Sequence, residues 1–193
     1  MYFIKSDIHS IKNLALTAIN EKLYVEGFHL KKALEKILLI SPDKLKTSFI
    51  ILAKEHEQGQ VVGISTFLMT EYCTVQTFIL PEYRGKGYAS SLITQVLDSV
   101  PEKFSKRIRF GLGEPHSFFL FRSLLLKGII KEEQLIEEEV RTKLNVLDVY
   151  LFCLKHSLNV ERYAPAWKTL FSSEEQQFIH DNQHAFCEKL IKP

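Results

Sequence analysis

The sequence lacks the features that mark several large classes of protein. Its three cysteines, Cys73, Cys153 and Cys187, are far apart and form no Cys-x-x-Cys pair, so we expect reduced, mostly buried thiols and no metal site. The first ten residues lack the apolar core of a secretory signal peptide. The most apolar run, Ser117–Leu126, is too short to span a membrane and contains Arg122. These absences predict a cytoplasmic protein that does not bind membranes.

A large excess of charge of one sign is also missing. The 193 residues carry a formal net charge of +2 at pH 7, which argues against a dedicated nucleic-acid binder, because such proteins usually present a basic face. Hydrophobic residues make up 46% of the chain and include 14 Phe. A chain of this length and composition can bury a sizeable core, and it suits one ordinary domain with an appendage.

Hydrophobic periodicity predicts an α+β protein, because short β-rich runs alternate with amphipathic helical stripes. The order β-α-α-β-β-β-α-β-α-β is typical of one mixed, mostly antiparallel sheet flanked by helices. The predicted strands are residues 2–5, 47–55, 61–69, 71–80, 107–112 and 148–155, and the predicted helices are a segment capped by Asp7 and residues 26–40, 89–100 and 116–128.

The last part of the chain predicts a separate helical segment. Residues 172–175, with the sequence SSEE, form a capping-box pattern at the start of a helix. The apolar stripe that follows must be buried against something. We therefore expect a domain over residues 1–157 and a C-terminal helical extension over residues 158–193 that packs on it. The members of the stripe are Phe178, Ile179, Ala185, Phe186 and Leu190.

Residues 80–92, LPEYRGKGYASSL, join the fourth predicted strand to the third predicted helix. Glycine lets main-chain N–H groups approach a ligand without interference from a Cβ atom. The first N–H groups of a helix have no internal partner, and the helix dipole adds positive charge there, as do Arg84 and Lys86. The segment therefore predicts a site for a phosphate or pyrophosphate. The alternative is an ordinary tight turn between strand and helix.

Two common phosphate-binding motifs are absent from this segment. The Walker pattern G-x-x-x-x-G-K-[ST] does not occur, and the dinucleotide pattern G-x-G-x-x-G fails because Ser90 stands at the third glycine. The pattern that does occur is R-x-x-G-x-A, at Arg84, Gly87 and Ala89. It resembles the pyrophosphate-binding motif of the GNAT (Gcn5-related) N-acetyltransferases.

Neighbouring segments agree with this resemblance. Val62-Gly63-Ile64 resembles the third strand of that family, and Phe78–Leu92 resembles its V-x-P-x-Y-R-G-x-G-x-G/A-x-x-L segment. The order of elements from Tyr2 to about Lys155 also fits. The resemblance implies a GNAT-like fold and an acetyl-CoA-dependent N-acetyltransferase, in which a primary amine attacks the thioester directly within a ternary complex.

The resemblance also implies which residues surround acetyl-CoA. Phe78 and Ile79 would contact the pantetheine and acetyl groups through their main chain, and an N–H near Ile79 would stabilise the developing oxyanion. Arg84 would anchor either the loop or the phosphate. The implied cofactor-binding residues are Phe78, Ile79, Arg84, Gly85, Lys86, Gly87, Tyr88, Ala89, Ser90 and Ser117.

The acid–base residues of the family do not carry over. Leu124 stands where the family has a tyrosine that protonates the thiolate, and Leu112 stands where some members have a glutamate base. The candidate catalytic residues are instead Glu114 and His116, which lie between the fifth strand and the fourth helix, because histidine titrates near neutral pH. The competing interpretation is that His116 caps the helix and Glu114 is a solvated loop charge.

Two other functions stay open from the sequence. One is a catalytically weak or inactive GNAT-like protein that binds acetyl-CoA as a sensor or adaptor, which the missing tyrosine favours. The other is an anion-binding interaction module unrelated to acyl transfer. For the enzyme, the acceptor is an amine of a small molecule or of a protein. Residues 158–193 would then either cover part of the acceptor side or form a homodimer contact.

Overall fold

The computed structural model describes residues 1–24, 28–69, 73–105, 108–110, 115–136 and 172–182. The chain divides into two compact units, each described by itself below. The first comprises Met1–Gly113 with Glu133–Ile136, and the second comprises Glu114–Glu132 with Glu137–Pro193. Within the described residues, no helix is both long and apolar enough to cross a membrane.

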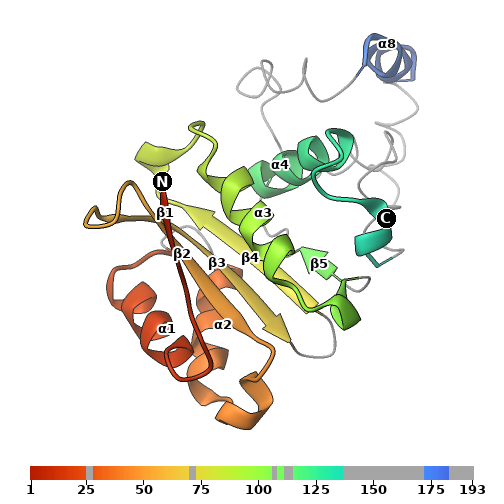
Figure 1. Ribbon diagram of the computed structural model, residues 1–193. Coiled ribbons are helices and arrows are strands. Elements are labelled where there is room, and N and C mark those ends of the chain that lie inside the picture. Colours follow the sequence, from red (N-terminus) through yellow and green to blue (C-terminus); the bar gives the residue numbers. More distant parts are fainter. Residues whose placement is uncertain (25–27, 70–72, 106–107, 111–114, 137–171, 183–193) are drawn as a thin grey trace, which may run out of the picture. The chain divides into compact units, whose positions relative to one another are not determined.

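A five-stranded mixed sheet forms the centre of the first unit (Figure 1). Its strands lie in chain order, with antiparallel pairing from β1 to β4 and parallel pairing between β4 and β5. A tight turn cannot join a parallel pair, so the chain crosses over through α3. The strands are β1 (Tyr2–Lys5), β2 (Phe49–Lys54), β3 (Val61–Met69), β4 (Cys73–Ile79) and β5 (Ile108–Phe110), and the helices are α1 (Ile11–Asn20), α2 (Phe28–Leu39) and α3 (Tyr88–Ser99).

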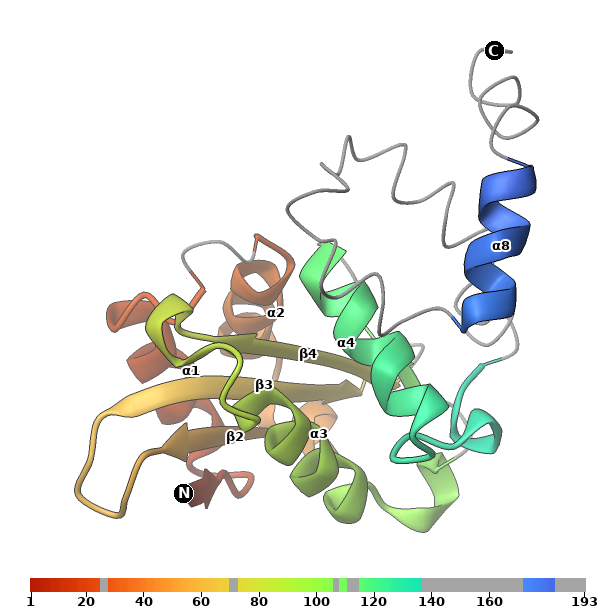
Figure 2. The same ribbon diagram turned by 90° about the horizontal axis from the view of Figure 1, so that it is seen from above.

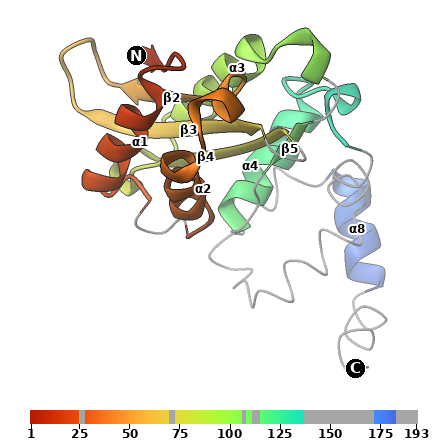
Figure 3. The ribbon, with the colours of Figure 1, turned by 90° about the horizontal axis from the view of Figure 1, so that it is seen from below.

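Different helices cover the two faces of this sheet (Figures 2 and 3). Helices α1 and α2 pack on each other and on one face, while α3 packs across β2, β3 and β4 on the other. Side chains alternate along β3, so that Ile64 and Leu68 join the buried cluster with α1 and α2. On the opposite face, Leu92 and Val96 of α3 are fully buried. These layers confirm the predicted α+β class.

The start of the first helix differs from the prediction. Asp7 does not cap α1, because α1 begins at Ile11 with Ser10 at its N-cap. Instead, Asp7 Oδ1 accepts hydrogen bonds from the N–H groups of His9 at 2.9 Å and Ser10 at 2.7 Å. The bond from the Ser10 N–H is the main cause of a lowered Asp7 pKa. The carboxylate therefore caps the turn that precedes α1. The strand predicted at residues 148–155 lies outside the described residues.

A close contact between β3, β4 and α3 explains the glycine at position 63. Gly63 lies opposite Ile79 across the two strands. A Cβ atom on Gly63 would lie 2.4 Å from Ile79 Cδ1, 3.0 Å from the carbonyl oxygen of Phe78 and 3.2 Å from Leu92 Cδ1. The absence of a side chain here therefore lets the end of β4 and the first turns of α3 pack closely over β3.

We predict that Gly63→Ala destabilises the first unit by about 1–3 kcal/mol, the usual range for overpacking a dense core. Urea unfolding followed by circular dichroism would measure the change. Ile79→Val removes the Cδ1 atom with which the new methyl group collides. The double variant should therefore recover part of the loss, although the contact with the Phe78 carbonyl oxygen stays. A Gly63→Ala variant as stable as the wild type would contradict this explanation.

The second unit contains α4 (Pro115–Leu126) and α8 (Ser173–Asp181). Gly128 adopts φ of +68° after the end of α4, and its N–H donates to the carbonyl oxygen of Leu125 at 2.9 Å. The N–H of Ile129 donates to the carbonyl oxygen of Leu124 at 3.0 Å. These two bonds form a Schellman motif, which satisfies carbonyl groups at the helix end. The predicted C-cap at Gly128 is thus confirmed.

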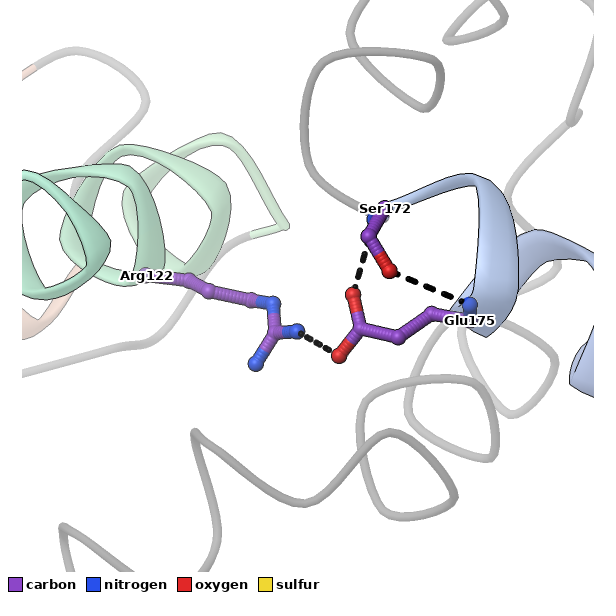
Figure 4. A network of polar contacts seen from close by, with 3 residues as sticks. All are labelled: Arg122, Ser172 and Glu175. Carbon is purple, nitrogen blue, oxygen red and sulfur yellow. Dashed lines mark hydrogen bonds and ion pairs between the residues drawn. The ribbon is translucent and has the colours of Figure 1, made fainter.

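An ion pair joins α4 to the start of α8 (Figure 4). The Arg122 side chain is only 1% exposed, and its Nη2 lies 3.2 Å from Oε1 of Glu175. The same carboxylate accepts the main-chain N–H of Ser172 through Oε2 at 2.9 Å, while Ser172 Oγ accepts the N–H of Glu175 at 3.2 Å. The predicted capping box is confirmed. One carboxylate therefore both caps α8 and balances a buried guanidinium, whose pKa is lowered chiefly by its burial.

Helix α8 is shorter than the apolar pattern predicts. It ends at Asp181, with Asn182 at its C-cap, and Phe178 is half exposed. The other members of the predicted stripe beyond residue 182 lie outside the described residues, as does the boundary expected between residues 157 and 158. The packing of residues 158–193 on the main domain stays a prediction.

We predict that Glu175→Gln lowers the free energy of unfolding by about 1–3 kcal/mol, because Arg122 then loses a charged hydrogen-bond partner in a buried setting. Glutamine keeps the length of the side chain and can still accept the Ser172 N–H. Glu174→Gln is the matched control, since Glu174 is an exposed neighbour, and it should change stability by less than about 0.5 kcal/mol. Urea unfolding of both variants would measure their free energies of unfolding. Equal stability of the two would show that the ion pair contributes nothing measurable.

Candidate functional site

The last residue of β4 turns its main-chain polar groups away from β3. The N–H of Leu80 donates to the carbonyl oxygen of Val62 at 3.0 Å, which makes these two residues a hydrogen-bonded pair of the antiparallel ladder. Gly63 and Ile79 are then a non-hydrogen-bonded pair, so the N–H and C=O of Ile79 point toward the side on which β5 pairs with β4. Polar main-chain groups at the end of β4 therefore face that side.

The described ladder between β4 and β5 is short. It joins Cys73–Val75 to Ile108–Phe110, whereas β4 continues to Ile79. Cys73 is only 1% exposed, and its Sγ lies 3.2 Å from Met69 Sδ, so this thiol is part of the core, as predicted. The main chain that could pair with residues 76–79 of β4 would belong to residues 111–114, which lie outside the described residues.

The loop after β4 needs glycine for its backbone conformation. Residues Pro81–Tyr83 form one turn of 3₁₀ helix, and Gly85 and Gly87 then adopt φ of +78° and +83°. An added Cβ would meet nothing within 4 Å at either glycine. Within the protein, positive φ rather than crowding therefore requires glycine at these two positions. Residues 84–87 are exposed, so the loop faces solvent.

The N-terminus of α3 is left without a side-chain cap. Its N-cap is Gly87, and the first intrahelical bond runs from the Ser91 N–H to the carbonyl oxygen of Gly87 at 3.1 Å. The N–H groups of Tyr88, Ala89 and Ser90 consequently have no acceptor within the helix. The first turn also contains no acidic residue. This arrangement attracts an anion through both the N–H groups and the helix dipole.

The two cations of the loop have different surroundings. Arg84 Nε donates to the carbonyl oxygen of Ile79 at 3.1 Å, and its guanidinium carbon lies 5.5 Å from the centre of the Phe78 ring. Arg84 thus ties the loop back to the end of β4. Lys86 Nζ instead lies 4.9 Å from the centre of the Tyr83 ring. Arg84 was expected to anchor either the loop or the phosphate, and the contact of its Nε is that of a loop anchor.

Tyr83 links the loop to two other parts of the unit. Its hydroxyl accepts a hydrogen bond from Gln60 Nε2, which comes from the turn between β2 and β3. Its ring meets the Tyr88 ring edge to face, with centroids 6.0 Å apart. Desolvation is the main cause of a raised Tyr83 pKa, and the charge of Glu55 adds to it. Sequence reasoning missed Gln60, because no local pattern relates residues 23 positions apart.

The structure brings together most of the predicted cofactor-binding residues, since Phe78, Ile79 and residues 84–90 are consecutive or adjacent at this junction. Glu114 lies outside the described residues, and so do the side chains of His116 and Ser117, which belong to the first turn of α4. Leu124 is 2% exposed and apolar, so that position of α4 offers no proton donor. In the described part of the chain, no three His, Cys, Asp or Glu side chains converge to hold a metal ion.

Comparison with known proteins identifies one family. A model of the acetyltransferase (GNAT) family matches residues 14–116, which is more than half of the chain. No curated protein matches the sequence.

Several solved chains are similar to this one, and they include the following two. One is ribosomal-protein-alanine N-acetyltransferase from Brucella melitensis biovar Abortus 2308, at 15% identity and a TM-score of 0.42, with 64% of this chain and 91% of that chain covered. The other is AAC(6')-Iy in complex with the bisubstrate analog CoA-S-monomethyl-acetylneamine, at 16% identity and a TM-score of 0.41, with 64% of this chain and 88% of that chain covered.

Proposed function

This chain belongs to the GNAT family of acetyltransferases, and we propose that it transfers the acetyl group of acetyl-CoA to a primary amine. The observation that carries the proposal is the junction between β4 and α3. There, two glycines with positive φ place an uncapped helix N-terminus and two cations beside the end of a strand. The pyrophosphate of acetyl-CoA is an anion that suits such a site.

The proposed reaction follows from the chemistry of a thioester and an amine. The amine nitrogen attacks the acetyl carbonyl carbon, so a C–N bond forms and the C–S bond to CoA breaks. The developing oxyanion would be stabilised by the N–H of Ile79, whose direction away from β3 supports this role. The ammonium proton must leave before attack, and the departing thiolate takes up a proton afterwards.

We assign the removal of the amine proton to His116 or Glu114. The family positions for a base and an acid are occupied by Leu112 and Leu124, and neither side chain can exchange a proton. Both candidate residues stand immediately before or at the start of α4. The alternative is that water carries the proton away and the substrate enters as the free amine.

The second candidate function is an acetyl-CoA-binding sensor or adaptor without turnover. The observation that favours it is the apolar, buried Leu124 at the position where family members carry the tyrosine acid. Consumption of acetyl-CoA against a panel of small amines, amino acids and peptides separates the two functions. Mass spectrometry of ligands that copurify with the protein would identify the donor. Binding of CoA without turnover of any amine would leave only the sensor or adaptor function. Failure to bind CoA would exclude both functions.

We predict that Gly87→Glu weakens CoA binding at least tenfold, because the new negative charge lies beside the helix N-terminus and repels the pyrophosphate proposed to bind there. Gly87→Gln is the matched control. Both variants strain the backbone equally at φ of +83°, so the difference between them isolates the charge. Isothermal titration calorimetry would measure both affinities, and circular dichroism would verify that both variants fold. Equal affinities for the charged and neutral variants would exclude an anion at this position.

For His116→Ala, we predict a fall of about 10²–10⁴-fold in kcat/KM, the usual contribution of a positioned acid or base, with little change in CoA affinity. In the wild type, the rate would rise with pH as the base loses its proton. In the His116→Ala variant, this rise of the rate with pH should become flatter. Glu114→Gln is the parallel test of the other residue. If both variants lose less than about threefold and the rate still follows the pKa of the substrate amine, water carries the proton.

A further inference from the structure

Lys86 is held by an aromatic ring rather than by a carboxylate. Its Nζ lies 4.9 Å from the centre of the Tyr83 ring, within the range of a cation–π contact. Among the described residues, no carboxylate forms an ion pair with Lys86, although Glu82 precedes it in the same loop. A carboxylate partner would neutralise the ammonium group. A ring fixes its position and leaves its full charge available to an anion.

The ring that holds Lys86 is itself fixed at two points. Gln60 Nε2 donates to the Tyr83 hydroxyl, and the Tyr88 ring meets the Tyr83 ring nearly at right angles, at 88°. Tyr88 is the first residue of α3, so Tyr83 contacts the helix end whose first N–H groups have no acceptor within the helix. The ring thus connects the β2–β3 turn, the loop and the first turn of α3.

A lysine held in this way has an advantage in binding. A free lysine side chain has many rotamers, and ordering it on a ligand costs conformational entropy. If a ring already restricts the lysine side chain, less conformational entropy is lost when an anion binds. The contact lies within the same short loop as Gly85 and Gly87, whose positive φ values shape the turn around Lys86.

We infer that Tyr83, fixed by Gln60, is a positioning residue that holds Lys86 for contact with a phosphate group of CoA. The inference rests on the proposed function, because it takes the ligand to be CoA. Tyr83 itself does not contact the reacting atoms. Its effect on affinity therefore passes through Lys86, and this distinguishes positioning from a purely structural role in the loop.

A double-mutant cycle tests the inference by calorimetry with CoA. Lys86→Gln should weaken binding about tenfold, as expected for loss of a charge-assisted hydrogen bond. Tyr83→Leu removes the ring and should weaken binding about two- to fivefold, the range of an exposed cation–π contact. In the Lys86→Gln background, the same change should cost less than about 1.5-fold, because neighbouring residues that act together are not additive. Tyr83→Phe keeps the ring but loses the hydrogen bond from Gln60, so it should weaken binding less than Tyr83→Leu does.

Phe104→Leu is the matched control variant. Lys103 Nζ lies 4.7 Å from the centre of the Phe104 ring, a similar contact beyond the far end of α3. This variant should bind CoA as the wild type does. Dephospho-CoA, which lacks the 3′-phosphate, identifies the phosphate involved. If Lys86→Gln costs as much with dephospho-CoA as with CoA, Lys86 contacts the pyrophosphate, and if the cost disappears, it contacts the 3′-phosphate.

The outcomes separate this inference from the proposed function. Wild-type protein that does not bind CoA overturns both. Wild-type protein that binds CoA, with equal costs of Tyr83→Leu in the presence and absence of Lys86, overturns the inference alone, because the ring then stabilises the loop independently. A Tyr83→Leu variant with unchanged affinity also overturns it. The inference is supported if Tyr83→Leu lowers CoA affinity in the wild type but not in the Lys86→Gln background, and if Phe104→Leu leaves the affinity unchanged.

Discussion

The parallel pairing of β4 and β5 is the constraint on which the candidate site depends. Parallel neighbours cannot be joined by a hairpin, so the chain must leave the end of β4, pass over one face of the sheet and return. Helix α3 makes this passage, and its N-terminus therefore follows directly after the end of β4. Unpaired N–H groups of a helix are thereby placed near the main-chain groups of a strand end. The first unit thus obtains from its topology a geometry that suits an anion, before any charged side chain contributes.

Side chains then refine this geometry, and the two neighbouring cations do so differently. Arg84 bonds the carbonyl oxygen of Ile79, which a planar guanidinium with several donors can do while it also lies near the Phe78 ring. Lys86 lies over Tyr83, and none of the described carboxylates forms an ion pair with it. Gly63 of β3 lies opposite Ile79, and its missing side chain lets Ile79 and Leu92 pack closely over β3. The loop is thus held by contacts from β3, β4 and the β2–β3 turn.

The second unit shows how a single carboxylate can serve two purposes. Glu175 caps α8 through its local bonds to Ser172 and also pairs with Arg122, which comes from a helix 53 residues earlier. Burial of a guanidinium is costly unless it has charged or polar partners. A helix-capping glutamate that also neutralises it couples the formation of α8 to the position of α4 within this unit.

The sequence alone determined the local features of this protein. The period of its apolar residues predicted the order of elements through α4, the glycines predicted the turn before α3, and the capping box and Gly128 predicted two helix ends, because each of these signals depends on residues close together in the chain. The same locality explains the error at Asp7, whose carboxylate caps a turn instead of α1.

Contacts between distant segments were decided only by the tertiary structure. Three such contacts follow from how strands and helices pack. They are the hydrogen bond from Gln60 to Tyr83, the ion pair of Arg122 with Glu175, and the position of Gly63 opposite Ile79. A charge or a glycine in the sequence does not specify its spatial partner, since that partner is set by register and packing, which many residues determine together.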